Sequence, residues 1–466
     1  MTENKLSILG GTPLRTRPFV VGPMTDDKEE AMVLSAIREQ NFSRYIGAYS
    51  SDIENILRMP SAEAAKVEAP WHYLGGPNVR AFAAEFAKKF GARFAVPVNS
   101  ATSGLSAALA AAGVGPGDEV IVPGLSFSAT GSAVLLFNSI PVFVDVDAFT
   151  FCVDPVAIES AITPRTKALL PVHLLGNVCD MDRIMEIARR HNLVVIEDCA
   201  QAPGAKWRGR HVGTVGQAGV FSFQQSKNIM TGEGGMVITN DPEIARKCRL
   251  ISNHGEIAMH ESLSDNDLAN VVGCNFRMPE LCAALGRAQL EKLDRVNEWR
   301  NRNAEYLVRR LSGVNGLRPP FVQEGVDYVC HVLSFLYDEA ELGLPRSVFI
   351  AALRAEGVPV GTGYVRAMYE NPTFIRRIAY GTHGSPWTDT SPPSPVTYRH
   401  RQCPTIEALI NERFLWLYHV AYPSTTEDME DIARALEKVL ANIPELRRNE
   451  ERVVATGNTA KQQGRL

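Results

Sequence analysis

Lys227 is the residue whose type and surroundings point most clearly to chemistry. Residues 220–223 have the composition of a short buried strand, and the polar residues after them lead to a Gly-Glu-Gly-Gly turn at 232–235. The lysine is therefore expected just beyond the end of a strand. Burial beside polar groups lowers the pKa of a lysine, and a neutral amine can form a Schiff base with an aldehyde. Taken alone, such a residue would more often be a surface lysine in a loop, and it is the surroundings that favour a chemical role.

A carboxylate, Asp198, follows another apolar run. Residues 193–196 are Leu-Val-Val-Ile, a pattern typical of a parallel strand that helices cover on both faces. In such sheets ligands bind beyond the carboxyl ends of the strands, where Asp198 is expected. A carboxylate there can pair with a protonated pyridine nitrogen, as in enzymes that use pyridoxal phosphate (PLP), while the lysine holds the aldehyde carbon. The alternative for Asp198 is a helix cap.

Four ordered segments resemble the DegT/StrS family of fold type I PLP-dependent aminotransferases, which modify nucleotide sugars and cyclitols. The segments are 99–105 (Asn-Ser-Ala-Thr-Ser-Gly-Leu), 117–123 (Gly-Asp-Glu-Val-Ile-Val-Pro), 197–202 (Glu-Asp-Cys-Ala-Gln-Ala) and 222–227 (Ser-Phe-Gln-Gln-Ser-Lys). The likeness covers residues 5 to 40 and 75 to 440 and is weakest in the C-terminal third. It implies a PLP-dependent aminotransferase (transaminase) that works as a homodimer.

The resemblance assigns roles to eight residues. It makes Lys227 and Asp198 the catalytic pair, and both also bind the cofactor. The other cofactor-binding residues that it implies are Thr102 and Ser103 for the phosphate, Phe127 stacked on the ring, Gln201 near the ring hydroxyl, Ser222 near the phosphate, and Asn275 in a loop that crosses into the neighbouring subunit. Simple N-capping remains the alternative for the residues at 102 and 103, and core packing for the phenylalanine. No metal site is expected.

The resemblance also implies a reaction, in which an amino group passes from glutamine or glutamate to a keto-sugar or keto-cyclitol in the biosynthesis of amino sugars, aminocyclitols or antibiotics. Cys199 and the Gln-Gln-Ser-Lys sequence at 224–227 are more similar to the cyclitol and aminobenzoate branch than to the nucleotide-sugar branch. Pro203 is a departure, because relatives often have histidine there. A dehydratase or aminohydroxybenzoate-synthase-like enzyme on the same fold is one alternative, although dehydratase relatives carry histidine in place of Lys227. A non-catalytic regulator is another.

The composition argues against several other classes of protein. The chain has 466 residues, of which 45% are hydrophobic and 21% charged, and its net charge is −4. These values are ordinary for an enzyme and favour neither nucleic acid nor a membrane as partner. The eight cysteines form no C-x-x-C pair, so neither a zinc site nor a disulfide scaffold is indicated. The N-terminal residues lack a signal-peptide profile and no apolar run approaches ~20 residues, so we expect a cytoplasmic protein.

Strands that alternate with helices predict an α/β fold whose parallel sheet positions these side chains. The family implies a large domain with a mostly parallel, seven-stranded sheet and a smaller α+β C-terminal domain. The expected divisions are a lead-in and helix (1–43), an inserted loop or lid (44–76), the large PLP-binding domain (77–300), the small domain (301–446) and a disordered tail (447–466). For the insertion, a lid over the substrate and a variable surface loop are both open.

Overall fold

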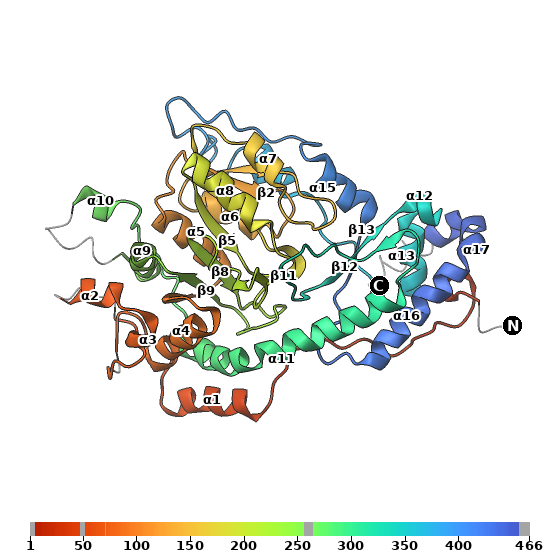
Figure 1. Cartoon of the computed structure of the whole chain (residues 1–466), viewed down its shortest axis with the longest axis horizontal. Helices are drawn as coiled ribbons and strands as arrows, with labels where there is room; N and C mark the ends of the chain where they lie inside the picture. Colours follow the sequence, from red (N-terminus) through yellow and green to blue (C-terminus); the bar gives the residue numbers. More distant parts are fainter. Residues whose placement is uncertain (1–4, 47–51, 70, 256–263, 456–466) are drawn as a thin grey trace.

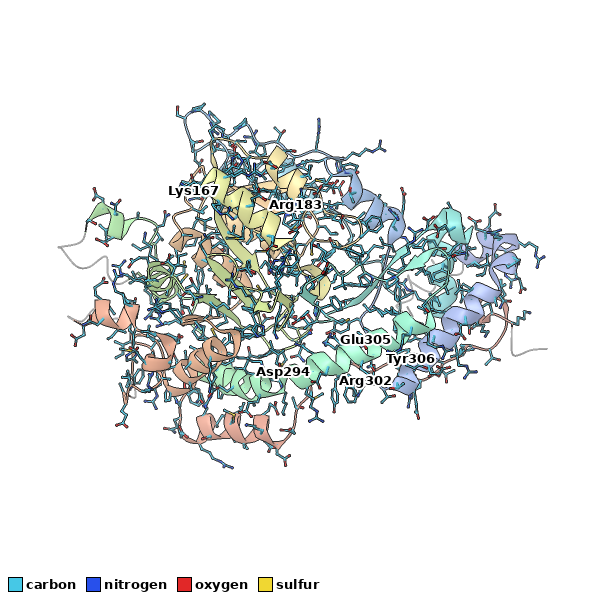
Figure 2. All side chains as sticks on the ribbon, viewed as in Figure 1. Lys167, Arg183, Asp294, Arg302, Glu305 and Tyr306 are labelled. Carbon is cyan, nitrogen blue, oxygen red and sulfur yellow. The ribbon has the colours of Figure 1, made fainter. Side chains whose placement is uncertain are left out.

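The computed structural model describes residues 5–46, 52–69, 71–255 and 264–455. The long helix α11 (Glu280–Arg310) runs beneath the large domain and reaches the small domain at the other end of the molecule (Figure 1). Its exposed side carries Asp294, Arg302 and Glu305, which are labelled in Figure 2. Its buried side carries Asn297 and Arg300. No helix among the described residues has the length and apolarity that a membrane span requires.

Seven strands form the central sheet, in the order β1-β9-β8-β5-β4-β2-β3. The pairs from β8 to β3 are parallel, and β9 runs antiparallel to both of its neighbours. The bounds are β1 (Phe94–Val98), β2 (Glu119–Pro123), β3 (Ile140–Val144), β4 (Thr166–Leu169), β5 (Val194–Asp198), β8 (Ala218–Ser222) and β9 (Gly235–Thr239). The prediction of an α/β architecture with a mostly parallel, seven-stranded sheet is confirmed.

Helices cover both faces of this sheet, which explains why its strands are almost continuously apolar. One face packs against α5, α6 and α9, and the other against α4, α7, α8 and the first half of α11. Rings from α4 pack on β8: the rings of Phe86 and Phe221 meet edge to face, with centroids 5.1 Å apart. The bounds are α4 (Pro77–Phe90), α5 (Ala101–Ala111), α6 (Ala129–Leu135), α7 (Pro155–Ser160), α8 (Met181–His191) and α9 (Pro242–Ser252). The strand that leads to Lys227 is therefore anchored in a rigid aromatic cluster.

The N-terminal part of the chain packs along the large domain. After α1 (Asp27–Arg38), the inserted segment forms α2 (Ile53–Arg58) and α3 (Ser61–Ala64). Arg249 of α9 donates hydrogen bonds of 2.7 Å to the carbonyl oxygens of Leu57 and Met59. These bonds fix the described part of the insertion to the large domain, while residues 47–51 and 70 lie outside the described residues.

The small domain is built on a three-stranded antiparallel sheet, β10-β12-β13, covered by helices. Its elements are β10 (Leu317–Arg318), β12 (Leu333–Tyr337), α12 (Glu339–Leu342), α13 (Arg346–Ala355), β13 (Phe414–Leu417), α16 (Thr426–Ala441) and α17 (Ile443–Arg448).

A minor sheet, β11-β6-β7, consists of Val326–Asp327, Lys206–Trp207 and Arg210–His211. Short helical turns complete the chain: η1 (Ser7–Leu9), η2 (Leu174–Gly176), α10 (Asp265–Leu268), η4 (Met368–Glu370), α14 (Pro372–Ile375), α15 (Pro404–Ala408) and η5 (Leu409–Arg413).

Two segments of the C-terminal part show packing that the sequence did not predict. Residues 367–409 lie within the range assigned to the small domain, yet they pack on the large one, where Tyr398 donates a 2.7 Å hydrogen bond to the carbonyl oxygen of Pro141. Their buried aromatic side chains cover the β3 edge of the sheet. The tail was expected to be disordered from 447, but residues 450–455 are helical and Val453 is buried against the small domain. Residues 456–466 lie outside the described residues.

Candidate active site

A cavity of about 540 Å³ lies beyond the carboxyl ends of β5 and β8. This is the edge at which parallel sheets bind ligands. Side chains from both domains line it. Six of the eight predicted site residues are among them: Thr102, Phe127, Asp198, Gln201, Ser222 and Lys227.

Lys227 is held in the cavity wall by the turn that follows β8. Its backbone N–H donates to the carbonyl oxygen of Gln224 at 2.9 Å, and Gln225 N donates to the Gly232 carbonyl at 2.9 Å. Gly232 has a φ of +82°, which favours glycine at this point of the turn. Burial lowers the pKa of Lys227, while the charge of Asp198 acts in the opposite direction. Lowering the pKa increases the fraction of neutral amine, the form that attacks an aldehyde.

Asp198 ends β5 and is oriented by two hydrogen bonds. Its Oδ1 accepts from the backbone N–H of Ala200 at 3.1 Å, and its Oδ2 accepts from Thr130 Oγ1 at 3.0 Å. Burial raises the pKa of Asp198, and both hydrogen bonds act to lower it. A cation placed opposite this carboxylate would favour its ionised form, as the protonated nitrogen of a pyridine does.

The N-terminus of α5 forms another wall. Thr102 lines the cavity, but Ser103 does not, because its hydroxyl donates to Asn99 Oδ1 at 2.5 Å and its N–H donates to the N-cap Ser100. For Ser103 the geometry is thus that of the capping alternative. A Cβ atom on Gly104 would meet Val220 Cγ1 at 2.8 Å, so glycine lets α5 lie close against β8. The first N–H groups of this helix can therefore hold a phosphate beside Ser222.

Gln201 and Phe127 complete the predicted cofactor contacts. Gln201 Oε1 accepts from Leu175 N at 3.0 Å, and its Nε2 donates to the hydroxyl of Tyr364 at 3.0 Å, leaving one amide hydrogen for a ligand. The Phe127 side chain is 65% exposed at the cavity. It is therefore not a core residue, and its ring face is free to stack on an aromatic ligand.

Asn275 does not line the cavity of its own chain. Its side chain is exposed, and its Oδ1 accepts from Arg277 Nε at 3.0 Å. Its backbone carbonyl accepts from Asn99 Nδ2 at 3.3 Å, which fixes the loop next to the start of α5. This position is compatible with a side chain that serves a neighbouring subunit.

The lining residues that the sequence did not reveal include Thr130, His331, Tyr364 and Trp416. Thr130 lies one helical turn after Phe127, so helix periodicity could have placed it on the same face. The other three come from the C-terminal part of the chain, more than 100 residues after Lys227, and carry no local motif. Only the folded chain brings them to the cavity.

The residues around this cavity fit PLP. An amine and a buried carboxylate face one space, a free phenyl ring lies beside them, and a helix N-terminus with Thr102 and Ser222 can receive a phosphate. Lys227 would hold the aldehyde carbon and Asp198 the pyridine nitrogen. The observation behind this fit is that two oppositely charged groups, both perturbed by burial, share one cavity.

His173, Glu197 and Cys199 also lie close together behind the site, with possible metal-ligand atoms within 4.8 Å of one another. Both Glu197 oxygens are already occupied, however. They accept from His173 Nε2 at 3.0 Å and from three backbone N–H groups of residues 213–216. Burial raises the pKa of Cys199 well above its usual value, which disfavours the thiolate that binds metals. The cluster fixes a turn beneath the sheet.

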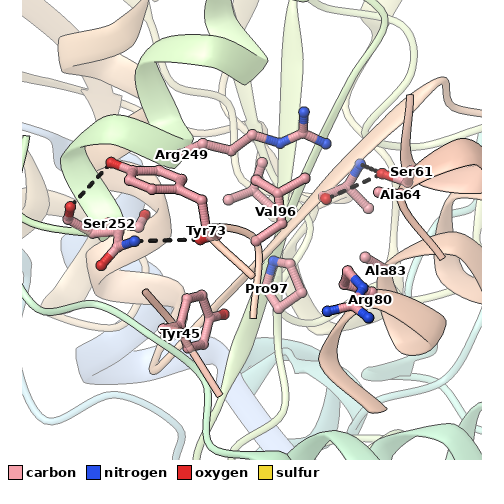
Figure 3. Close-up of a pocket in the computed structure, with 13 residues that line it drawn as sticks. Tyr45, Ser61, Ala64, Tyr73, Arg80, Ala83, Val96, Pro97, Arg249 and Ser252 are labelled. Carbon is pink, nitrogen blue, oxygen red and sulfur yellow. Dashed lines mark hydrogen bonds between the residues drawn. The ribbon is translucent and has the colours of Figure 1, made fainter. Parts of the chain in front are cut away.

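A separate cavity of about 30 Å³ lies between the insertion, α4, β1 and α9 (Figure 3). Tyr73 closes it by donating a 3.1 Å hydrogen bond to the carbonyl oxygen of Asn253. Burial lowers the pKa of Arg249 to about 10, and burial together with the charges of Arg80 and Arg249 lowers that of His72 to about 4. The insertion lines this small cavity, and none of the residues that line the large one belongs to 44–76. A role as a lid stays a prediction.

Comparisons with known proteins find aminotransferases that are similar to most of this chain. The DegT/DnrJ/EryC1/StrS aminotransferase family model matches residues 60–400. L-glutamine:2-deoxy-scyllo-inosose aminotransferase of Streptoalloteichus tenebrarius is 37% identical over 454 residues, which cover 95% of this chain and 99% of that protein. L-glutamine:scyllo-inosose aminotransferase of Streptomyces griseus is 38% identical over 380 residues, which cover 79% of this chain and 87% of that protein. An aminotransferase structure from Psychrobacter cryohalolentis has a TM-score of 0.74 at 30% identity, covering 91% of this chain and all of that one.

Proposed function

The chain belongs to the DegT/DnrJ/EryC1/StrS aminotransferase family, and we propose that it transfers the amino group of glutamine to a keto-cyclitol with PLP as its cofactor. The observation that carries the proposal is the shared cavity of Lys227 and Asp198. The choice of substrates is supported by relatives similar over most of the chain, whose names give L-glutamine as donor and an inosose as acceptor.

In this reaction the predicted site residues of the cavity would have distinct tasks. PLP, when bound, supplies the electron sink that stabilises a carbanion at the donor's α-carbon. Lys227 Nζ would hold the cofactor's aldehyde carbon and, once displaced by the donor amine, act as the base that takes the α-proton. Asp198 would hold a proton on the pyridine nitrogen, while Thr130 and Ala200 N keep its oxygens in place.

The remaining contacts orient the cofactor. Phe127 would stack on the ring, Gln201 would bond the ring hydroxyl, and Ser222 with Thr102 and the α5 N-terminus would hold the phosphate. The same groups serve both halves of the reaction, in which the donor leaves as a keto acid before the acceptor binds. This order predicts ping-pong kinetics.

We further propose a homodimer in which Asn275 reaches the partner's site. The proposal is supported by the exposed Asn275 side chain, which lies outside its own cavity, and by Val272 of the same loop, which is 73% exposed. In such a dimer the partner subunit would cover this apolar side chain and remove its surface from water. A cytoplasmic location is supported by eight free cysteines, which suit a reducing compartment.

The direct experiment supplies purified protein with PLP, glutamine and scyllo-inosose or 2-deoxy-scyllo-inosose. We expect an aminated cyclitol by mass spectrometry and parallel lines in double-reciprocal plots. Glutamate and a series of keto-sugars serve as competing donors and acceptors. The proposal is overturned if no keto-cyclitol is aminated while a keto-sugar is, or if none of these acceptors yields product.

A further inference from the structure

His331 stands in the cavity wall close to Lys227, yet it belongs to the segment that leads into the small domain. The residue is 6% exposed and lines the cavity. Its backbone is fixed on both sides, because Arg300 Nη1 donates to its carbonyl oxygen at 2.7 Å and its own N–H donates to the Leu175 carbonyl at 3.2 Å. The imidazole ring therefore has a defined position.

A chain of hydrogen bonds decides which ring nitrogen carries the proton. A backbone carbonyl can only accept, so Asn297 must turn its Nδ2 to the Pro203 carbonyl at 2.9 Å. Its Oδ1 then accepts from Asn228 Nδ2 at 2.9 Å. Asn228 Nδ2 also donates to the Cys330 carbonyl at 3.2 Å, which leaves Asn228 Oδ1 facing His331 Nδ1 at 3.2 Å.

Because Asn228 Oδ1 is an acceptor, His331 Nδ1 must donate, and Nε2 of a neutral ring is then an acceptor. Among the described residues no group bonds Nε2, and the ring lines the cavity. The fold thus presents one unpaired acceptor to the space in front of Lys227. The Pro203 carbonyl begins the chain of bonds.

The charges around the ring keep it neutral. Burial lowers the pKa of His331 well below its usual value, and the positive charges of Lys227 and Arg300 act in the same direction. The other ring packed against it is Tyr418, whose centroid lies 6.3 Å away. An imidazole lone pair repels a carboxylate oxygen, so its partner must be a hydrogen-bond donor. The polar groups of a keto-cyclitol, apart from its carbonyl, are hydroxyls.

We propose that His331 Nε2 accepts a hydrogen bond from one hydroxyl group of the keto-cyclitol acceptor, and that Asn228 and Asn297 are positioning residues that fix this nitrogen as an acceptor. The inference rests on the proposed function and deepens it. It makes the small-domain wall of the cavity, rather than the cofactor wall, the part that recognises the polyol.

The first test combines His331→Phe with scyllo-inosose and analogues that each lack one hydroxyl. In the wild type, loss of the recognised hydroxyl should raise the acceptor KM about tenfold or more, since it leaves a buried acceptor unpaired. In His331→Phe the KM for scyllo-inosose should already be raised, and loss of that hydroxyl should have no further effect. The inference is overturned if the substitution changes the KM of the donor glutamine instead. It is also overturned if, in His331→Phe, loss of each hydroxyl still raises the acceptor KM as much as in the wild type.

The second test asks whether the tautomer matters. In Asn228→Asp, a carboxylate facing Nδ1 raises the pKa of His331, so Nε2 gains a proton as the pH falls and turns into a donor. We expect the acceptor KM of this variant to rise at low pH and to recover at high pH, while the wild-type KM stays flat. Asn240→Asp, an exposed change of the same charge, is the control and should behave like the wild type. If the acceptor KM of Asn228→Asp is raised equally at every pH, the role of Asn228 is merely structural and the inference is overturned.

These outcomes can be separated from failure of the proposed function. The conversion of the bound cofactor by glutamine, followed by its absorbance, involves no acceptor and should persist in His331→Phe within about threefold of the wild type. If the wild type aminates no keto-cyclitol, the proposed function itself fails. If the wild type is active and His331→Phe has an unchanged acceptor KM, only the present inference fails.

Discussion

Thr130 and Asp198 are joined by a 3.0 Å hydrogen bond from the threonine Oγ1 to the carboxylate Oδ2. Thr130 is buried on the first turn of α6, while Asp198 ends β5, so the bond connects two elements that the sequence separates by 68 residues. It holds one oxygen of the carboxylate in place and lowers a pKa that burial raises. The protonation state of this carboxylate therefore depends on a residue that the family resemblance did not identify.

Thr130→Val should shift the pH dependence of activity. The variant lacks a hydrogen bond that lowers the pKa of Asp198, so its carboxyl group takes up a proton at a higher pH than in the wild type. Because the ionised form is the active one, the acid limb of kcat/KM should move upward by about one pH unit. Thr130→Ser keeps a hydroxyl and should show the wild-type limb. If the acid limbs of the kcat/KM profiles superimpose for all three proteins, Thr130 does not set the pKa of Asp198.

Asp198→Asn should bind PLP but transaminate poorly. A neutral amide cannot keep the pyridine nitrogen protonated, which weakens the electron sink. A fall in kcat of several powers of ten is expected, since each ~1.4 kcal/mol of lost transition-state stabilisation is tenfold in rate. Cofactor absorbance measures binding, and single-turnover kinetics with glutamine measure the chemical step. Near-normal turnover would exclude Asp198 from the mechanism.

The sequence predicted the cavity residues of the large domain better than those that the C-terminal part of the chain contributes. Lys227, Asp198 and the α5 N-terminus follow strands with clear apolar patterns, so the edge of a parallel sheet could be assigned to them in advance. His331, Tyr364 and Trp416 reach the same cavity only because the small domain packs against the large one, and that packing depends on contacts distant in sequence. For the same reason the packing of residues 367–409 on the large domain could not be predicted: their proline-rich course has no periodicity, and the aromatic side chains that dock them show only in three dimensions.

Glu197→Gln should destabilise the fold, although Glu197 is not among the residues that line the cavity. Its buried carboxylate accepts from three backbone N–H groups of the 213–216 turn and from His173. An amide group offers one acceptor oxygen and turns an NH₂ toward donors, so the free energy of unfolding should fall by about 3 kcal/mol. Urea titration measures this.

Because these contacts rather than a metal hold the cluster together, EDTA should leave the unfolding midpoint of the wild type unchanged. A midpoint lowered by the chelator would contradict this account.

Mixed dimers test the shared site. If Lys227→Ala and Asn275→Ala subunits reassemble together, one site carries both changes and the other carries neither, so activity should exceed that of either parent. Asn275→Ala alone should be severely impaired and should bind PLP less tightly, since its amide would contact the partner's phosphate. A fully active Asn275→Ala protein, or an active monomer by ultracentrifugation during turnover, would contradict the proposal.

The attachment of the cofactor to Lys227 is the central claim, and chemical trapping measures it directly. Borohydride reduction of the PLP-loaded protein, followed by digestion and peptide mapping, should place the reduced cofactor on the peptide that contains Lys227. Lys227→Ala should fold, yield no such adduct and show no turnover. Recovery of the label on another lysine of the wild type, or a fully active Lys227→Ala protein, would contradict the account.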